Sequence, residues 1–129
     1  MDPEKIISMV KIVTVEDSLL VAKRIESMLT DVDNLEFLGN AVGIPQALEL
    51  IACKQPDAVV LDLHLGNGDS GIDLLTILRN KYPRLKIIIL TNLADPHYQS
   101  ACFDLGADYF FDKSNDFDKV PDVLKDIQL

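Results

Sequence analysis

The chain has 129 residues, of which 48% are hydrophobic and 26% are charged. This size and apolar content indicate one folded domain rather than a disordered chain. Its 12 basic and 21 acidic residues give a formal net charge of −9. Because proteins neutralise nucleic-acid phosphates with clustered basic residues, we expect no direct contact with nucleic acid.

The first half of the chain alternates short apolar runs with helical patterns. Residues 10–15 are mostly β-branched, which favours a strand. Apolar residues at i, i+4, i+7 and i+8 after Ser18 predict an amphipathic helix. A second strand is expected at 35–42, and Pro45 suits the first turn of the helix that follows. Residues 58–61 are apolar throughout, as expected of a strand that helices cover on both faces.

The second half of the chain repeats this alternation. Asp69 and Ser70 are typical turn and N-cap residues, and we expect them to open the third helix. We expect further strands at 86–90 and 109–111. We expect helices between the loop glycines Gly66, Gly68 and Gly71 and Pro83, over 95–105 and over 120–127. Five such strand–helix units predict an α/β fold, a parallel sheet with helices on both faces.

Polar residues follow four of the predicted strands. In a parallel α/β sheet the functional crevice lies outside the carboxyl ends of the strands. Those ends carry Glu16, Asp17, Asp62, Thr91 and Lys113. Carboxylates gathered at one point repel each other unless a hard cation neutralises them, and such oxygen ligands suit Mg²⁺. A lysine and a threonine nearby can hold phosphate oxygens, so the combination predicts a phosphoryl-transfer site.

No sequence feature indicates secretion or a membrane anchor. Cys53 and Cys102 lack a CxxC spacing, and no N-glycosylation sequon occurs. Residues 1–8 lack the apolar region of a signal peptide, and no apolar run approaches the roughly 18 residues that span a bilayer. We expect a cytoplasmic protein, with residues 1–9 as a short N-terminal extension and residues 10–129 as one domain.

From about Val10 to Ile127 the chain resembles the response-regulator receiver domains of two-component signalling. In that family an acidic pair follows the first strand and a phosphoacceptor aspartate follows the third. A hydroxyl residue ends the fourth strand, and a lysine follows the fifth. The matching residues are Glu16 and Asp17, Asp62, Thr91 and Lys113. The resemblance implies a flavodoxin-like, doubly wound five-stranded parallel sheet of strand order 2-1-3-4-5.

The resemblance also implies a chemistry. Asp62 is expected to accept a phosphoryl group from a sensor histidine kinase, a phosphotransfer protein or a small phosphodonor. Mg²⁺ is expected on Asp17, Asp62 and the backbone carbonyl of His64, with Glu16 binding it directly or through water. Apart from this self-phosphorylation and the matching autodephosphorylation, we expect no enzymatic activity.

A signalling step is implied as well. Lys113 is expected to contact one phosphate oxygen and Thr91 to move toward another, while the aromatic Phe110 rotates inward. The surface near the fourth helix, fifth strand and fifth helix is then expected to shift and control binding of a downstream protein, which the sequence does not identify. Since the chain ends on the final helix, we expect a stand-alone receiver or one cut from a longer regulator.

Some positions depart from the family pattern, and alternatives stay open. Ser114 stands where the family usually has proline, and Asn92 stands where a small residue is usual. These departures keep open a pseudo-receiver that signals through protein contacts without phosphorylation. A phosphohydrolase of the haloacid-dehalogenase type also uses an aspartate nucleophile with Mg²⁺, but it needs a second aspartate where this chain has His64.

Overall fold

Five strands alternate with five helices in the computed structural model, which describes residues 9–66 and 68–127. The strands are β1 (Val10–Val15), β2 (Leu35–Ala41), β3 (Ala58–Leu61), β4 (Lys86–Thr91) and β5 (Tyr109–Asp112). The helices are α1 (Leu19–Thr30), α2 (Ile44–Lys54), α3 (Gly71–Lys81), α4 (Pro96–Asp104) and α5 (Lys119–Lys125). These bounds confirm the predicted element order. The expected extension at 1–9 lies outside the described residues except for Met9.

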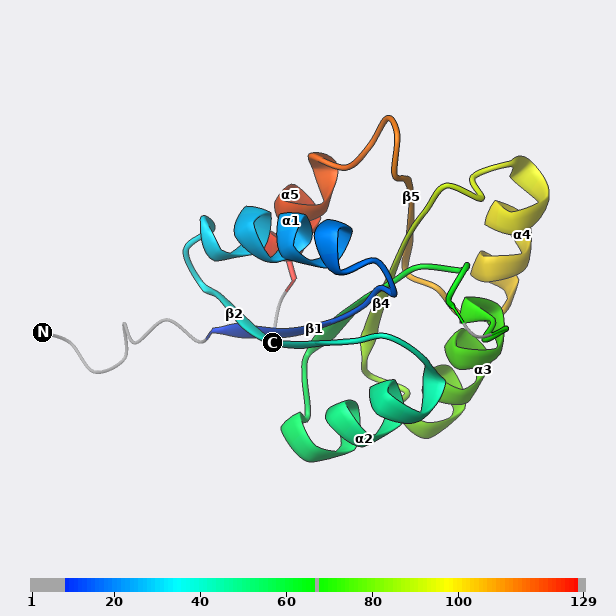
Figure 1. Ribbon diagram of the computed structural model, residues 1–129, viewed down its shortest axis with the longest axis horizontal. Helices are drawn as coiled ribbons and strands as arrows, with labels where there is room; N and C mark the ends of the chain where they lie inside the picture. Colours follow the sequence, from blue (N-terminus) through cyan, green and yellow to red (C-terminus); the bar gives the residue numbers. More distant parts are fainter. Residues whose placement is uncertain (1–8, 67, 128–129) are drawn as a thin grey trace, which may run out of the picture.

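The sheet is parallel throughout, with the order β2-β1-β3-β4-β5 (Figure 1). This confirms the predicted doubly wound fold. The pairing of β1 with β2 contains one irregularity, because Ile12 pairs with Phe37 whereas Val13 pairs with Gly39. Leu38 is thus an extra residue on β2, and Gly39 takes a φ of 153° there, a conformation that favours glycine.

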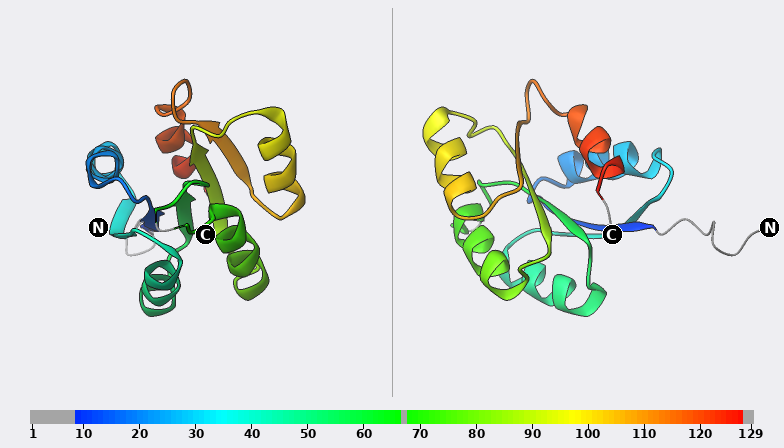
Figure 2. Two further views of the ribbon diagram at one scale, coloured as in Figure 1. Left: turned by 45° about the vertical axis from the view of Figure 1, so that its right-hand side comes forward. Right: turned by 180° about the vertical axis from the view of Figure 1, so that it is seen from behind.

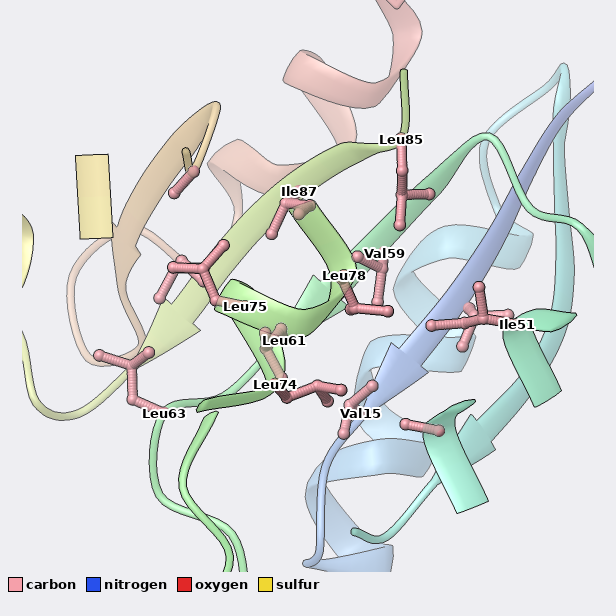
Figure 3. Packing of buried hydrophobic residues seen from close by; sticks show 14 of the residues in the cluster. Val15, Ile51, Val59, Leu61, Leu63, Leu74, Leu75, Leu78, Leu85 and Ile87 are labelled. Atoms are coloured by element: carbon pink, nitrogen blue, oxygen red, sulfur yellow. The ribbon is translucent and has the colours of Figure 1, made fainter. Parts of the chain in front are cut away.

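The helices form a layer on each face of the sheet. Helices α1 and α5 lie together on one face, and α2, α3 and α4 lie on the other (Figures 1 and 2). Alternate strand residues point to opposite faces, so Val59 and Ile87 belong to the core under α2–α4, whereas Val60 and Ile88 belong to the core under α1 and α5. Figure 3 shows how leucines of α3 pack against the strands in the first of these cores. None of the described helices is long and apolar enough to cross a bilayer.

Side-chain caps explain where the helices begin. Ser18 caps α1, Ser70 caps α3 and Asp95 caps α4, each by accepting backbone N–H hydrogen bonds of the first turn. Asp69 has a different role from the one expected. Its carboxylate accepts the backbone N–H of Ile44 at 2.9 Å, so Asp69 caps α2 and ties the β3–α3 loop to that helix, while Ser70 alone opens α3.

Arg79 ties several loops together at the amino edge of the sheet. Its guanidinium donates to the carbonyl oxygen of Gly106 at 2.8 and 2.9 Å and to the carboxylate of Asp108 at 2.8 Å. It also donates to the carbonyl oxygens of Tyr82, Pro83 and Leu85. The α3–β4 and α4–β5 loops are therefore held to one planar cation.

Candidate functional site

A cavity of about 420 Å³ opens at the carboxyl edge of the sheet. Of the residues predicted for the site, it is lined by Glu16, Asp17, Asp62, His64, Thr91 and Lys113. The fold brings them together because β1, β3 and β4 are neighbours and all end at this edge. Phe110 is the predicted residue that does not line the cavity.

Asp62 follows β3 and is buried, with 7% of its surface exposed. Its backbone N–H donates to the carbonyl oxygen of Val15 at 3.1 Å, which continues the sheet pairing by one residue. One carboxylate oxygen, Oδ1, accepts the N–H of His64 at 3.3 Å, and Oδ2 accepts Lys113 Nζ at 2.7 Å. The carboxylate is thus anchored on both oxygens while its residue lines the cavity.

The first residue of α3 packs directly on the backbone of Asp62. Gly71 donates its N–H to the carbonyl oxygen of Leu63 at 2.8 Å. A Cβ atom added to Gly71 would lie 2.1 Å from the carbonyl oxygen of Asp62 and 2.5 Å from Cα of Leu63. This close approach requires glycine and joins the start of α3 to the strand end that carries Asp62.

Glu16 is the most deeply buried acid of the site, at 2% exposure. Its Oε2 accepts the N–H of Ser18 at 3.1 Å. Its Oε1 lies 2.5 Å from Lys113 Nζ as an ion pair, yet it is buried and accepts no hydrogen bond of good geometry from any described residue. Burial raises the pKa of Glu16, and the nearby Lys113 offsets only part of that rise.

Lys113 pairs with two acids at once, Glu16 and Asp62. Burial by itself would lower the pKa of the Lys113 ammonium. The hydrogen bonds and charges of Asp62 and Glu16 outweigh that effect and raise the pKa above its ordinary value. Lys113 therefore stays charged and neutralises part of the acidic cluster.

The loop that carries Lys113 is fixed by two aspartates. Asp112 accepts the N–H of Ser114 at 2.9 Å and the side-chain amide of Asn115 at 3.0 Å. Asp116 in turn accepts the N–H of Asp112 at 3.1 Å. These hydrogen bonds order the turn at Ser114.

Three carboxylates of the site are close enough to share a cation. Glu16, Asp17 and Asp62 each offer an oxygen, and these oxygens lie within 4.8 Å of one another. Ligands of one Mg²⁺ at about 2.0–2.1 Å lie at most about 4.2 Å apart, so small side-chain adjustments suffice. The all-oxygen donor set and the buried Oε1 of Glu16 without a hydrogen bond fit such an ion.

Thr91 and Phe110 occupy neighbouring strands but different surroundings. Thr91 is fully buried, and its hydroxyl oxygen accepts the N–H of Leu93 at 3.1 Å. Phe110 is 8% exposed and belongs to the core under α2–α4, and its ring centroid lies 6.5 Å from that of Phe103 on α4. The inward rotation expected of Phe110 thus begins from a ring that is already buried.

Two contacts at the site were not predicted from the sequence. The pairing of Lys113 with Glu16, in addition to Asp62, is one. The other involves Asn40 of β2, whose side-chain amide donates to the backbone carbonyl of Glu16 at 3.0 Å. Gly39 was the available signal, since a glycine inside a strand pattern often marks a bulge.

Comparison with known proteins identifies the family. The family model of the response regulator receiver domain matches residues 12–125, and the chain belongs to this family. Its fold, element order and membership agree with the resemblance drawn from the strand-end residues. Receiver domains of this kind are components of two-component, phosphorylation-based signalling, and in general they are not enzymes.

Individual relatives are distant. A protein-glutamate methylesterase/protein-glutamine glutaminase of Clostridium acetobutylicum is 28% identical over 122 residues, which are 93% of this chain and 32% of that protein. The response regulator GacA of Pseudomonas aeruginosa is 24% identical over 119 residues, which are 92% of this chain and 55% of that protein. The chain therefore spans about a third to a half of the length of these relatives, and the match to the methylesterase concerns its receiver part.

A solved structure shares the fold. The isolated receiver domain of RcsB from Salmonella enterica serovar Typhimurium, determined in the presence of the phosphomimetic BeF3⁻, superimposes with a TM-score of 0.83 at 20% identity. The similarity covers 92% of this chain and 87% of that one. None of these comparisons supports the phosphohydrolase alternative.

Proposed function

We propose that this chain accepts a phosphoryl group on Asp62 in a Mg²⁺-dependent reaction, with a histidine kinase or a phosphotransfer protein as donor. The observation that carries the proposal is the surroundings of the Asp62 carboxylate. It is buried at the wall of a cavity, it is paired with Lys113, and it shares an acidic cluster with Glu16 and Asp17.

In the proposed transfer, an oxygen of Asp62 forms the new bond to phosphorus. The bond between phosphorus and the donor's histidine nitrogen breaks, and its electron pair returns to that nitrogen. The product on this chain is an acyl phosphate. Because such transfers depend mainly on positioning and charge stabilisation, the two hydrogen bonds that orient the Asp62 carboxylate matter for the geometry of attack.

The metal has a defined place in this proposal. Asp17, Asp62 and the backbone carbonyl of His64 would hold Mg²⁺, with Glu16 binding directly or through water. When bound, Mg²⁺ supplies positive charge to the acids and to the phosphoryl oxygens. The donor set and the spacing of the three carboxylates support this assignment.

Lys113 and Thr91 would then hold the product. Lys113 Nζ is already next to Asp62 Oδ2, so it can contact an oxygen of the phosphoryl group there. The hydroxyl of Thr91 accepts a backbone N–H and keeps its own proton for donation to a second oxygen. Movement of Thr91 would change the packing beside Phe110, because the two lie on adjacent paired strands.

The proposed output is a shift in the population of surface conformations near α4, β5 and α5. The ring centroid of Phe110 lies 6.5 Å from that of Phe103, which is 47% exposed on α4, so a movement of Phe110 would reach the surface there. We further propose that this surface controls binding of a downstream protein, that the chain works in the cytoplasm, and that residues 10–129 form the receiver domain.

The deciding experiment is intact-mass measurement after incubation with Mg²⁺ and acetyl phosphate. The wild-type chain is expected to gain one phosphoryl group that hydroxylamine removes, and the Asp62→Asn variant is expected to gain none. Asp57→Asn is the matched control. Asp57 precedes β3 at the opposite edge of the sheet, where its carboxylate accepts the N–H of Lys11, so this variant should be labelled like the wild type.

Other outcomes separate the alternatives. Label retained in Asp62→Asn would move the acceptor to another residue. If the wild type takes no label, titration with beryllofluoride and Mg²⁺ decides between two cases. Binding of this mimic indicates a receiver that accepts phosphate only from its own donor, and absence of binding indicates a pseudo-receiver. Release of many phosphates per chain from a small donor would instead support a phosphohydrolase.

A further inference from the structure

The backbone of Glu16 is held by β2 on both sides, although β1 has already ended at Val15. The N–H of Glu16 donates to the carbonyl oxygen of Ala41 at 2.9 Å. The carbonyl oxygen of Glu16 accepts the side-chain amide of Asn40 at 3.0 Å. The first bond continues the backbone ladder, and in the second a side chain takes the place of a backbone donor.

We infer that Asn40 is a positioning residue for the metal-binding acid pair, an inference that rests on the proposed function. The carbonyl that Asn40 holds belongs to the peptide plane between Glu16 and Asp17. Rotation of this plane changes the direction in which Asp17 leaves the backbone. Because the side chain of Asp17 is exposed, its position depends chiefly on that backbone. Asn40 thus acts on the metal site through the Glu16–Asp17 peptide and does not itself line the cavity.

A buried hydroxyl fixes which end of the Asn40 amide faces Glu16. Thr14 is fully buried, and its Oγ1 donates to Oδ1 of Asn40 at 2.7 Å. Since Oδ1 is engaged in this way, Nδ2 is directed at the carbonyl of Glu16. The three residues form a chain from the interior of the sheet to the acid pair, and each polar atom in it has a partner.

The bulge on β2 creates this arrangement. In parallel pairing, partner residues present their side chains to the same face, and Thr14 pairs with Asn40. Continued without the extra residue, the register that pairs Ile12 with Phe37 would place Gly39 opposite Thr14, and Asn40 would point to the other face. The left-handed φ of 153° at Gly39 is where the chain accommodates the shift.

The test compares Mg²⁺ affinity in the wild-type chain and in Asn40→Leu, which keeps the side-chain size but donates no hydrogen bond. Backbone amide chemical shifts near Asp62 report binding of Mg²⁺ alone, without any phosphodonor. Groups that hydrogen-bond to metal-site residues typically contribute 10-fold to 100-fold in affinity. Because Asn40 acts through one peptide, we expect Mg²⁺ binding about 10-fold weaker in Asn40→Leu.

Two further variants make the result specific. Phe37 lies on the same strand and packs against the core under α1 and α5. Phe37→Leu should therefore lower stability without changing the contacts of Glu16, and its Mg²⁺ affinity should equal that of the wild type. Thr14→Val keeps Nδ2 but removes the hydroxyl that orients it, and its affinity should lie between those of the wild type and Asn40→Leu. It also serves as the test if Asn40→Leu does not fold.

The outcomes separate this inference from the function on which it rests. If the wild type itself shows no Mg²⁺-dependent shifts near Asp62, the proposed metal site is wrong. If the wild type binds Mg²⁺ and Asn40→Leu binds it within about twofold, the positioning role is wrong. The role is also overturned if Phe37→Leu loses as much affinity as Asn40→Leu, because affinity would then follow general stability.

Discussion

Charged side chains at the two edges of the sheet differ in burial and in hydrogen bonding. At the amino edge, Arg79 and Asp108 are partly exposed, and the guanidinium is surrounded by carbonyl acceptors. At the carboxyl edge, acids are buried next to each other, and one oxygen of Glu16 accepts no hydrogen bond from the described residues. The four buried polar residues of the described chain all lie at or next to this second edge, namely Thr14, Glu16, Asp62 and Thr91.

This difference is consistent with a stabilising role for the amino edge and with the functional role proposed for the carboxyl edge. Polar groups that are partly exposed and hydrogen-bonded carry little free-energy penalty, and at the amino edge their hydrogen bonds hold loops to the sheet. Buried acids that repel each other destabilise the metal-free fold and are useful only where a cation or a phosphoryl group arrives. The same sheet therefore has one edge whose polar groups are paired within the protein and one edge that fits the proposed binding of a cation and a phosphoryl group.

Replacement of Lys113 should cause the largest loss of stability, because it disrupts the acidic cluster at the carboxyl edge. In Lys113→Met, Glu16 and Asp62 remain buried without their shared cation. Loss of one partner of a buried ion pair typically costs several kcal/mol, and we expect about 3 kcal/mol in urea unfolding without divalent cations. Added Mg²⁺ should recover part of this loss, because it supplies positive charge to the same acids.

Lys119→Met is the control for that variant. Lys119 also pairs with an aspartate, Asp116, but its side chain is 65% exposed, and exposed pairs contribute little to stability. Equal losses of unfolding free energy in the two lysine variants would contradict the contrast between a buried acidic site and an ordinary surface ion pair.

Replacement of Arg79 should disrupt the hydrogen bonds of the amino edge without affecting the carboxyl edge. In Arg79→Ala several hydrogen bonds are lost, but the freed carbonyls are partly reachable by water, so we expect a loss of about 2 kcal/mol. Mg²⁺ binding and phosphoryl uptake should stay at wild-type levels. A fall in either would mean that the two edges are coupled.

Cys102 on α4 gives a local readout of the same variant. It is fully buried, and burial raises the pKa of its thiol to about 11, so alkylation in the wild type should label the exposed Cys53 and spare Cys102. Arg79→Ala loosens the loop that follows α4 and should increase labelling of Cys102. Labelling of Cys53 at an unchanged rate is the internal control.

The smallest expected effect is on the pH dependence of stability, which depends on a buried acid of the carboxyl edge. Burial raises the pKa of Glu16 above its ordinary value of 4.5, so the folded chain binds this proton more tightly than the unfolded chain. The resulting stabilisation is complete below pH 4.5 and is lost as the pH rises through the raised folded pKa. In metal-free solution, Glu16→Gln should therefore gain stability relative to the wild type over that range. Parallel stability curves for the two proteins would contradict the raised pKa.

Much of this molecule could be predicted from local sequence patterns. Apolar runs such as 58–61 and 86–90 became central strands, since burial on both faces leaves a clear signal. The strand-end acids, Thr91 and Lys113 line one cavity because parallel strands present their carboxyl ends at one edge. These features depend on periodicity and topology, which a single chain displays directly.

What escaped prediction depends on contacts between distant segments. Asp69 is a good N-cap residue, but which helix it caps depends on how the β3–α3 loop lies against α2. The hydrogen bond from Asn40 to Glu16 depends on a one-residue bulge in β2. The bulge reverses the face of the sheet to which the following side chains of β2 point, and the alternation of apolar residues does not reveal where it occurs. Phe110 is already buried because it belongs to the core under α2–α4, which the sequence of β5 alone does not disclose.

The contact between Gly71 and Asp62 has a consequence for sequence evolution. Any side chain at position 71 would meet backbone atoms, and backbone cannot rotate away as a flexible side chain can. Position 71 is thereby closed to the other nineteen amino acids for as long as α3 begins where it does. Gly68, three residues earlier, has open space around a Cβ atom, and its limit is only its φ of 78°. Substitution at Gly68 is therefore limited by backbone conformation alone, whereas the start of α3 and the end of β3 that carries Asp62 cannot change independently of each other.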